Sequence, residues 1–198
     1  MSQAAHDDHH HTSLGIDNRK LGMWLLIASE CLLFGTLIGT YMIYRAGSVE
    51  GPDPADVLDI PITTISTFVL LMSSFSIVLA LHNIQHGNER AFRGWILVTA
   101  IGGLIFLGFQ TYEFTEFVHA GLGLTTNVFG SSFFMLTGTH GTHVAVGVIW
   151  LFSLFFSSLS GKLKEDAALK VDVMALYWHF VDVIWIVIFT VVYLFVFV

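Results

Sequence analysis

The sequence predicts an all-α integral membrane protein, folded as a bundle of five transmembrane helices. Hydrophobic residues make up 55% of the 198 residues and charged residues only 12%, and the mean hydropathy is +0.74, whereas soluble domains carry about 25% charged residues. The apolar residues also form long continuous runs of about 20 residues, the length that crosses about 30 Å of hydrocarbon as a helix. These runs lack the strict alternation of a membrane-barrel strand.

Five such runs follow one another along the chain. The first ends at Arg45, where charged and turn-forming residues begin, and the second ends at the polar segment 82–93. The third ends before Glu113 and Glu116, which we expect near water at the outer membrane surface. The fourth run is long enough to be tilted, and the fifth continues to the end of the chain. The expected helices cover approximately residues 21–44, 62–81, 94–112, 128–159 and 174–198.

Two regions are expected, a flexible His-rich tail at residues 1–20 and a single membrane domain at 21–198. Lysine and arginine in short loops set the orientation of a membrane protein, because they resist translocation. Seven of the eight lie in the N-terminal tail, the second loop and the fourth loop, which are on one side of the membrane. We therefore expect the N-terminus in the cytoplasm and the C-terminus outside.

Glu30 and two histidines are polar groups at similar depth in the first and fourth expected helices. An ionisable side chain at such a depth is costly unless it faces the bundle interior or a partner. Glu30 could bond a neighbouring helix as a neutral acid, relay protons or contact a lipid head group. His140 and His143 share one helix face, and we expect them to tie helices together, with Glu30 as the candidate partner. Gly35 and Gly39 could meet the glycines beside His140, which would let the two helices approach closely and bring Glu30 near the histidines. Metal ligation by the histidines stays open as an alternative.

The fifth expected helix begins with "YWHFVDVIW", which places His179 and Asp182 three residues apart. An imidazole beside a carboxylate could collect protons near the cytoplasmic surface. The same pair could instead fix the helix against its neighbours or hold a partner subunit. Trp178 and Trp185, seven residues apart, are expected to be packing or interface anchors.

Other functional classes find less support in the residues. A haem or copper centre needs more ligands than one clear pair, and His82, His86 and His119 lie at the ends of expected helices. A stand-alone proton transporter often shows internal repeats and broken helices, and neither is visible. The chain has no phosphate-binding loop, nucleophile triad or nucleic-acid patch.

Four motifs, in order and spacing, resemble cytochrome c oxidase subunit III, the third core subunit of haem-copper respiratory oxidases. They are "SECLLFG" (29–35), "QTYEF" (110–114), "FFMLTGTHGTHVAVG" (133–147) and "YWHFVDVIWIVIF" (177–189). The resemblance covers all five spans. It indicates the short five-helix form of bacterial and archaeal oxidases, since the long form has two further helices at its start.

The resemblance implies a non-catalytic subunit in a bacterial or archaeal plasma membrane, with no haem or copper of its own, because these centres belong to subunits I and II. Its expected partners are subunit I as the main contact, subunit II, small accessory subunits and structural phospholipids, and it would support proton uptake into subunit I. A lipid-binding or proton-related role is implied for Glu30, His140, His143 and Glu113, and an interface or proton-related role for His179, Asp182 and Trp178. By this resemblance the two histidines of the fourth helix are structural hydrogen-bonding groups.

The expected reaction of the whole complex is electron transfer from cytochrome c to oxygen, coupled to proton pumping. Subunit III of a quinol oxidase, or a relative associated with nitric oxide reductase, is the alternative that the motifs leave open. A copper-binding partner with a soluble domain would favour cytochrome c as the electron donor.

Overall fold

The structure, a computed structural model, describes residues 17–45, 59–161 and 167–195. These residues form five long α-helices and one terminal π-helical turn, with no strand among them: α1 (Asn18–Tyr44), α3 (Ile60–Gln85), α4 (Glu89–His119), α5 (Val128–Leu159), α6 (Ala167–Phe189) and η1 (Thr190–Leu194). All five α-helices are long and apolar enough to cross a membrane. The five-helix membrane fold is therefore confirmed, while most of the expected His-rich tail lies outside the described residues.

Asparagine or aspartate side chains begin four of the helices. Asp17, Asp59, Asn88 and Asn127 each accept a hydrogen bond from a backbone N–H in the first turn of the helix that follows. Such caps satisfy backbone donors that would otherwise have no partner at a helix start. Between α3 and α4 the chain reverses within three residues, and Gly87 takes a φ of 74° there, a conformation that favours glycine.

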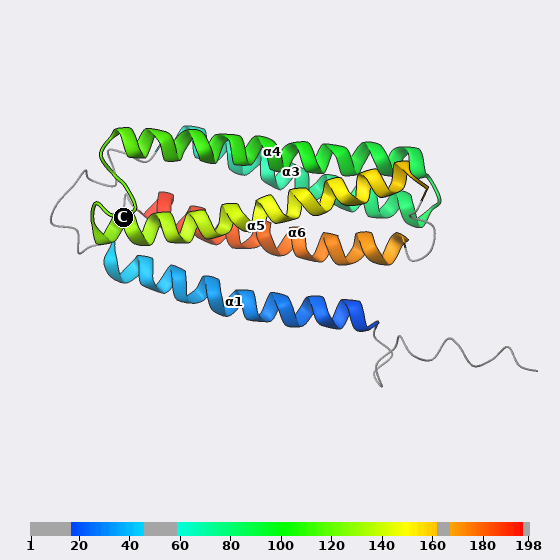
Figure 1. The fold of residues 1–198 in the computed structure, drawn as a ribbon, viewed down its shortest axis with the longest axis horizontal. Coiled ribbons are helices and arrows are strands. Elements are labelled where there is room, and N and C mark those ends of the chain that lie inside the picture. The colour runs from blue at the N-terminus through cyan, green and yellow to red at the C-terminus, as the bar shows by residue number, and fades with distance from the viewer. Residues whose placement is uncertain (1–16, 46–58, 162–166, 196–198) are drawn as a thin grey trace, which may run out of the picture.

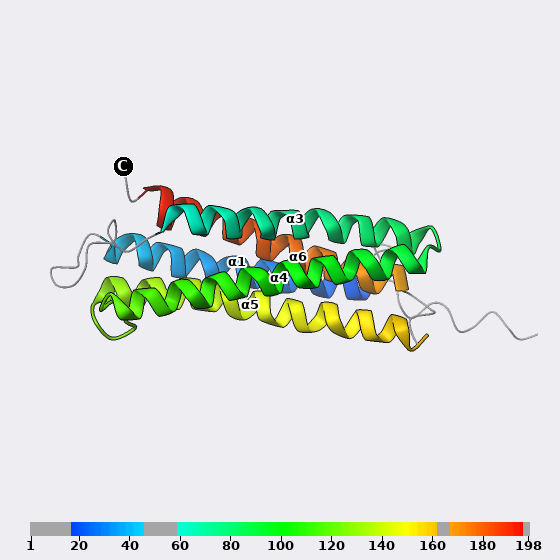
Figure 2. The ribbon, with the colours of Figure 1, turned by 90° about the horizontal axis from the view of Figure 1, so that it is seen from above.

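The helices lie side by side along the long axis of the molecule, and the two ends of the described chain lie at opposite ends of the bundle (Figures 1 and 2). Helix α6 contacts α1, α3 and α5, while α4 packs between α3 and α5. The most apolar stretch of α6 has 56% of its residues buried, against 11% for α1. Helix α6 is thus the central helix of the bundle and α1 the peripheral one.

Polar contacts join neighbouring helices at their ends. Lys20 of α1 forms an ion pair of 2.5 Å with Asp172 of α6. Arg93 of α4 donates to the Ser158 carbonyl oxygen near the end of α5 at 2.9 Å, and Arg45 donates to the carbonyl oxygen of Phe195. Cations are favourable beside the free carbonyls of a helix C-terminus, so these contacts help to fix the helix ends relative to one another.

Three of the expected helices were too short. Helix α4 covers Glu89–His119 instead of 94–112, α3 covers Ile60–Gln85 instead of 62–81, and α6 begins at Ala167 instead of 174. The expected ends were placed where polar residues interrupt the apolar runs. These polar residues have hydrogen-bond partners or face outward, so they do not end the helices.

Candidate functional site

Glu30 and His143 form a polar contact between α1 and α5 in the middle of the bundle. His143 Nε2 lies 3.2 Å from Glu30 Oε2, and each side chain keeps about a fifth of its surface exposed. The Tyr177 hydroxyl of α6 donates to the His143 carbonyl oxygen at 2.9 Å. This site therefore connects three helices at a depth where neither lipid chains nor bulk water offer hydrogen bonds.

The partners of the His143 ring determine where a proton must lie. His143 Nδ1 is 2.8 Å from the Thr139 carbonyl oxygen, which can only accept, so Nδ1 carries a hydrogen. The bond from Nε2 to Glu30 then needs one further proton. Either a protonated Glu30 donates to a neutral imidazole, or an imidazolium donates to a carboxylate. In both cases the pair holds one proton between its two side chains.

His140 differs from its neighbour, and the expectation that both histidines form hydrogen bonds is wrong for it. The side chain is fully buried, and neither ring nitrogen has a hydrogen-bond partner within the described part of the chain. The ring stacks on Trp185 at a centroid distance of 4.8 Å and meets the edge of Phe106 at 5.7 Å. Phe34 of α1 also packs against it. His140 is therefore a packing residue in an aromatic cage.

The glycines expected to bring α1 and α5 together do not do so. A Cβ atom added to Gly35 or Gly39 would meet nothing within 4 Å, and one added to Gly138 would only reach the Phe114 ring at 4.0 Å. Phe34 supplies the contact instead, because its ring lies 5.1 Å from the His143 ring. Glu30 is thus brought to His143 by aromatic packing.

Glu113 is buried, contrary to the expectation that it lies beside water. The Thr63 hydroxyl of α3 is 2.7 Å from Glu113 Oε1, and the Tyr193 side chain is a second hydrogen-bond partner. The π-helical turn at Thr190–Leu194 carries Tyr193. Glu113 thus joins α3, α4 and η1, whereas Glu116 is exposed as expected.

The two tryptophans of α6 are buried anchors between helices. The Trp178 indole N–H donates to Ser73 Oγ at 3.0 Å, and the Trp185 N–H donates to Thr67 Oγ1 at 2.9 Å. A Cβ atom on Gly147 would lie 2.6 Å from the Trp178 ring, so the ring needs this glycine. Trp178 is fully buried within the chain and therefore offers no surface to a partner subunit, which corrects its expected interface role.

His179 and Asp182 point into different surroundings although they lie three residues apart. His179 is half-buried, and its Nδ1 lies 2.7 Å from the Ser74 hydroxyl of α3. Asp182 is only 2% exposed, and neither of its oxygens has a hydrogen bond of regular geometry with a described residue. Ser74 is nevertheless within reach of Asp182. No ion pair between His179 and Asp182 is present in the described ranges, so these residues do not form the directly bonded pair that their spacing suggested.

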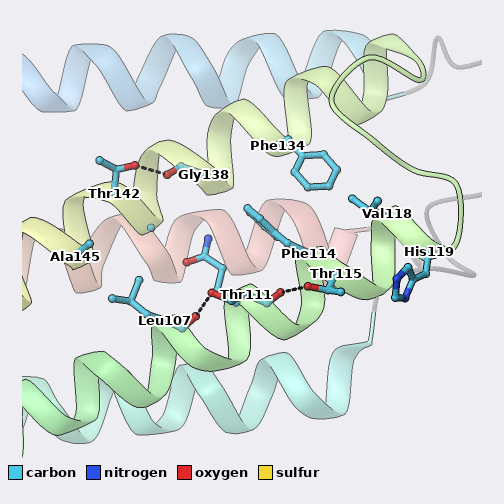
Figure 3. A pocket seen from close by; sticks show the side chains of 12 residues that line it. Leu107, Thr111, Phe114, Thr115, Val118, His119, Phe134, Gly138, Thr142 and Ala145 are labelled. Carbon is cyan, nitrogen blue, oxygen red and sulfur yellow. Dashed lines mark hydrogen bonds between the residues drawn. The ribbon is translucent and has the colours of Figure 1, made fainter.

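A groove of about 580 Å³ runs between α4 and α5. Phe114, Phe134, Val118 and His119 lie toward one end, and Leu107 with Ala145 toward the other (Figure 3). The threonine hydroxyls of its walls bond to carbonyls of their own helices, as Thr142 does to Gly138 at 2.9 Å. The groove is therefore largely apolar over most of its length.

Several residues of these polar contacts were not singled out by their sequence pattern. Ser74, Thr63 and Tyr193 are ordinary residues of apolar helices until the fold brings them to His179 and Glu113. Gln110 is similar: its side-chain amide donates to the Thr137 carbonyl oxygen at 2.7 Å, in space left by the missing Cβ of Gly141. The repeated serine and threonine residues along α3 are the one sequence signal that could have indicated a polar face on that helix.

Within the ranges that the structure describes, no group of three or more His, Cys, Asp or Glu side chains could hold a metal ion. Among the described residues, His143 is the one histidine with a carboxylate within ion-pair distance, and this contact involves two side chains only. Structural zinc sites use four protein ligands and catalytic ones three. The donor set at Glu30 and His143 falls short of either.

Comparison with known proteins finds relatives that are named as the third subunit of a cytochrome c oxidase or a quinol oxidase. The family model for cytochrome c oxidase subunit III matches residues 1–197. The chain is 39% identical to a probable quinol oxidase subunit 3 of Staphylococcus saprophyticus, over 88% of both chains. It is 39% identical to cytochrome c oxidase subunit 3 of Bacillus sp. strain PS3, over 89% of this chain and 86% of the relative, and 40% identical to that of Alkalihalophilus pseudofirmus, with the same coverage.

Proposed function

The chain belongs to the cytochrome c oxidase subunit III family, as a multi-pass plasma-membrane subunit of a haem-copper terminal oxidase, and from this premise we propose that it carries no redox centre and acts by stabilising the subunits that do. Its main partner would be subunit I, with subunit II and small accessory subunits as further contacts. In this role it supports proton uptake into subunit I without itself transferring electrons.

The Glu30–His143 contact is the observation that carries this proposal. Both groups lie in the middle of transmembrane helices, yet they bond to each other and to a backbone carbonyl. His140 is enclosed by aromatic rings, so no open ligand position faces it. The intramembrane polar groups therefore contribute to holding helices together, which supports a structural role.

A proton-related role is also proposed for the Glu30–His143 pair. The pair shares one proton, and a fifth of each side chain remains exposed on the bundle surface. A partially exposed pair can exchange this proton with a neighbouring group of the complex, whereas the buried Glu113 is better suited to holding α3, α4 and η1 together.

Structural lipid is proposed for the groove between α4 and α5. The groove opens on the side of two transmembrane helices, and its walls are apolar over most of their length. The medium on such a face is lipid hydrocarbon, so an acyl chain fits the lining chemistry. The end near His119 lies at the helix terminus, at the level of lipid head groups.

Cytochrome c is proposed as the electron donor of the complex, with a quinol as the second candidate. The second candidate is kept because the relative from Staphylococcus saprophyticus, named as a probable quinol oxidase subunit, is as similar to this chain as the cytochrome c oxidase relative from Bacillus. The copper site of subunit II in the purified complex would separate these donors.

The test is purification of the tagged chain from its native membranes, in wild-type form and as Glu30→Gln. We expect haem-containing oxidase subunits in both preparations and nearly unchanged oxygen reduction per haem in the variant, because no electron passes through this chain. Thr36→Val, on an exposed position of the same helix, is the control for nonspecific effects. Loss of haem or copper from a fully assembled Glu30→Gln complex would refute the non-redox role. Slower oxygen reduction with the full haem and copper content would instead be assigned to the proton-related role of the pair.

A further inference from the structure

His179 is an unusual polar group because it lies in the middle of a span and is still partly exposed. It lies about 18 Å along the helix from Ala167 and about 22 Å from Leu194 at 1.5 Å per residue. Its Nδ1 bonds to Ser74, whereas its Nε2 has no hydrogen-bond partner among the described residues. The other ionisable groups at this depth are either paired, as Glu30 and His143 are, or enclosed.

The surface around His179 is a narrow apolar stripe on α6. Val183 is 56% exposed and Ile186 is 42% exposed, and both lie on the same helix face as His179, at spacings of four and seven residues. Helix α6 runs between its neighbours α1 and α3 (Figure 1). On α3, Val78 is also exposed, one turn beyond Ser74. The central helix thus reaches the bundle surface along a stripe that includes one imidazole.

The depth of His179 restricts what can cover its free nitrogen. The hydrocarbon layer is about 30 Å thick, so lipid head groups at its edges remain far from a group near its centre. Acyl chains offer neither a donor nor an acceptor, and an unsatisfied polar group in hydrocarbon is costly. A side chain on another transmembrane helix can reach this depth and form the bond.

We propose that the α6 stripe of His179, Val183 and Ile186 is the docking site for a transmembrane helix of another oxidase subunit, and that this helix donates a hydrogen bond to His179 Nε2. The inference rests on the proposed function as a subunit of an oxidase complex. It specifies the face by which the chain attaches and the chemistry of the partner side chain, which would be a hydroxyl, an amide or a cationic donor.

A hydrogen-bond donor on the partner helix is favoured over an acceptor, because a donor also gives the buried Asp182 carboxyl group a hydrogen-bond partner. When Nε2 accepts a bond, the imidazole hydrogen lies on Nδ1 and is donated to Ser74 Oγ. The Ser74 hydroxyl hydrogen is then free to turn to Asp182, which lies within its reach but lacks a hydrogen bond of regular geometry. An acceptor on the partner would reverse this order, because the Ser74 hydroxyl would then donate to Nδ1 and an ionised Asp182 would be left without a donor.

Site-specific photocrosslinking in native membranes tests the docking face. The exposed Cys31 is first replaced by Ser, and a cysteine is then introduced at Val183 or, as a matched control, at Val146, which is 51% exposed on α5. Each is labelled with a benzophenone maleimide and irradiated, and adducts on the tagged chain are identified by mass spectrometry. We expect V183C to crosslink to a transmembrane segment of another oxidase subunit and V146C to give no such adduct.

Other outcomes of the crosslinking separate the inference from its premise. Adducts of V183C with lipid or quinol alone, or subunit adducts from V146C alone, would overturn the docking face while oxidase subunits still copurify. If no haem-copper subunit copurifies with the unmodified tagged chain, the proposed function fails first.

The hydrogen bond itself is tested by substitution of His179 in the full complex. His179→Leu should weaken retention of the chain during detergent washes by about threefold to fivefold, the effect of one interhelical hydrogen bond in a membrane. His179→Gln should recover most of it, because its amide can donate to Ser74 and accept from the partner. Because His179→Leu also loses the bond to Ser74, the helix content of each variant is measured by circular dichroism to check that the bundle is still folded. Retention equal to wild type in His179→Leu would overturn the proposed bond.

Discussion

The contact between Glu30 and His143 gives the most quantitative prediction. Glu30→Leu and His143→Phe each remove the 3.2 Å bond between α1 and α5, and each leaves one polar partner behind in the span. Leaving a buried polar group unsatisfied costs about 1–3 kcal/mol, and the lower end applies here because each side chain is about a fifth exposed. The coupling between the two residues should be about 1 kcal/mol, since interhelical bonds in membranes average about 0.6 and reach about 1.7 kcal/mol.

A double-mutant cycle measures this coupling directly. The four proteins are unfolded with SDS in mixed micelles, and helix content is followed by circular dichroism to obtain the free energy of unfolding. The double variant should be more stable than the sum of the single effects predicts, by about 1 kcal/mol, a factor of about five in the folding equilibrium.

The matched control is His140→Phe, one turn away on the same helix. His140 has no hydrogen-bond partner within the described residues and stacks on Trp185, so an aromatic ring can replace it without breaking a bond. We expect its unfolding free energy to change little or to increase. Zero coupling in the cycle, or a cost for His140→Phe as large as that for His143→Phe, would refute this account of the two histidines.

Two further predictions concern the groove and the orientation of the chain. Gly138→Leu fills the groove between α4 and α5 and should lower the amount of phospholipid that copurifies with the complex. The control, Gly35→Leu, lies in open space on α1 and should not change this amount. Equal lipid content in both variants would count against a lipid in this groove. A cysteine at Leu124 should react with an impermeant maleimide in intact cells, and one at His86 only after permeabilisation, because the loops alternate sides and lysine and arginine favour the cytoplasm. The reverse labelling pattern would invert the expected orientation.

The fold could be predicted from the sequence because hydropathy acts on whole segments. Runs of apolar residues long enough to span a bilayer leave few alternatives to a helix bundle, and α5 covers the same residues, 128–159, as its expected span. The end of α4 could not be predicted in this way. Glu113 interrupts the apolar run, but its carboxyl group is bonded to Thr63, 50 residues away in the chain, and this partner becomes visible only in three dimensions.

The contact of Glu30 with the histidine pair could also be predicted, from their similar depth. The choice between His140 and His143 could not, because residues three apart lie on one helix face and differ only in their angle toward α1. Phe34 determines which histidine bonds to Glu30, because its ring packs against both imidazoles and leaves only His143 facing Glu30. Side-chain packing of this kind depends on the relative rotation of two helices, which the sequence pattern does not specify.

The central claim is that this chain stabilises an oxidase without holding an electron-carrying centre, and metal analysis of the purified chain tests it most directly. The tagged chain is separated from its partners in mild detergent, its fold is checked by circular dichroism, and its iron, copper and visible absorption are measured. The account predicts far less than one iron or copper atom per chain and no haem band. One native haem or copper per chain, lost on replacement of His143 or His140, would contradict it.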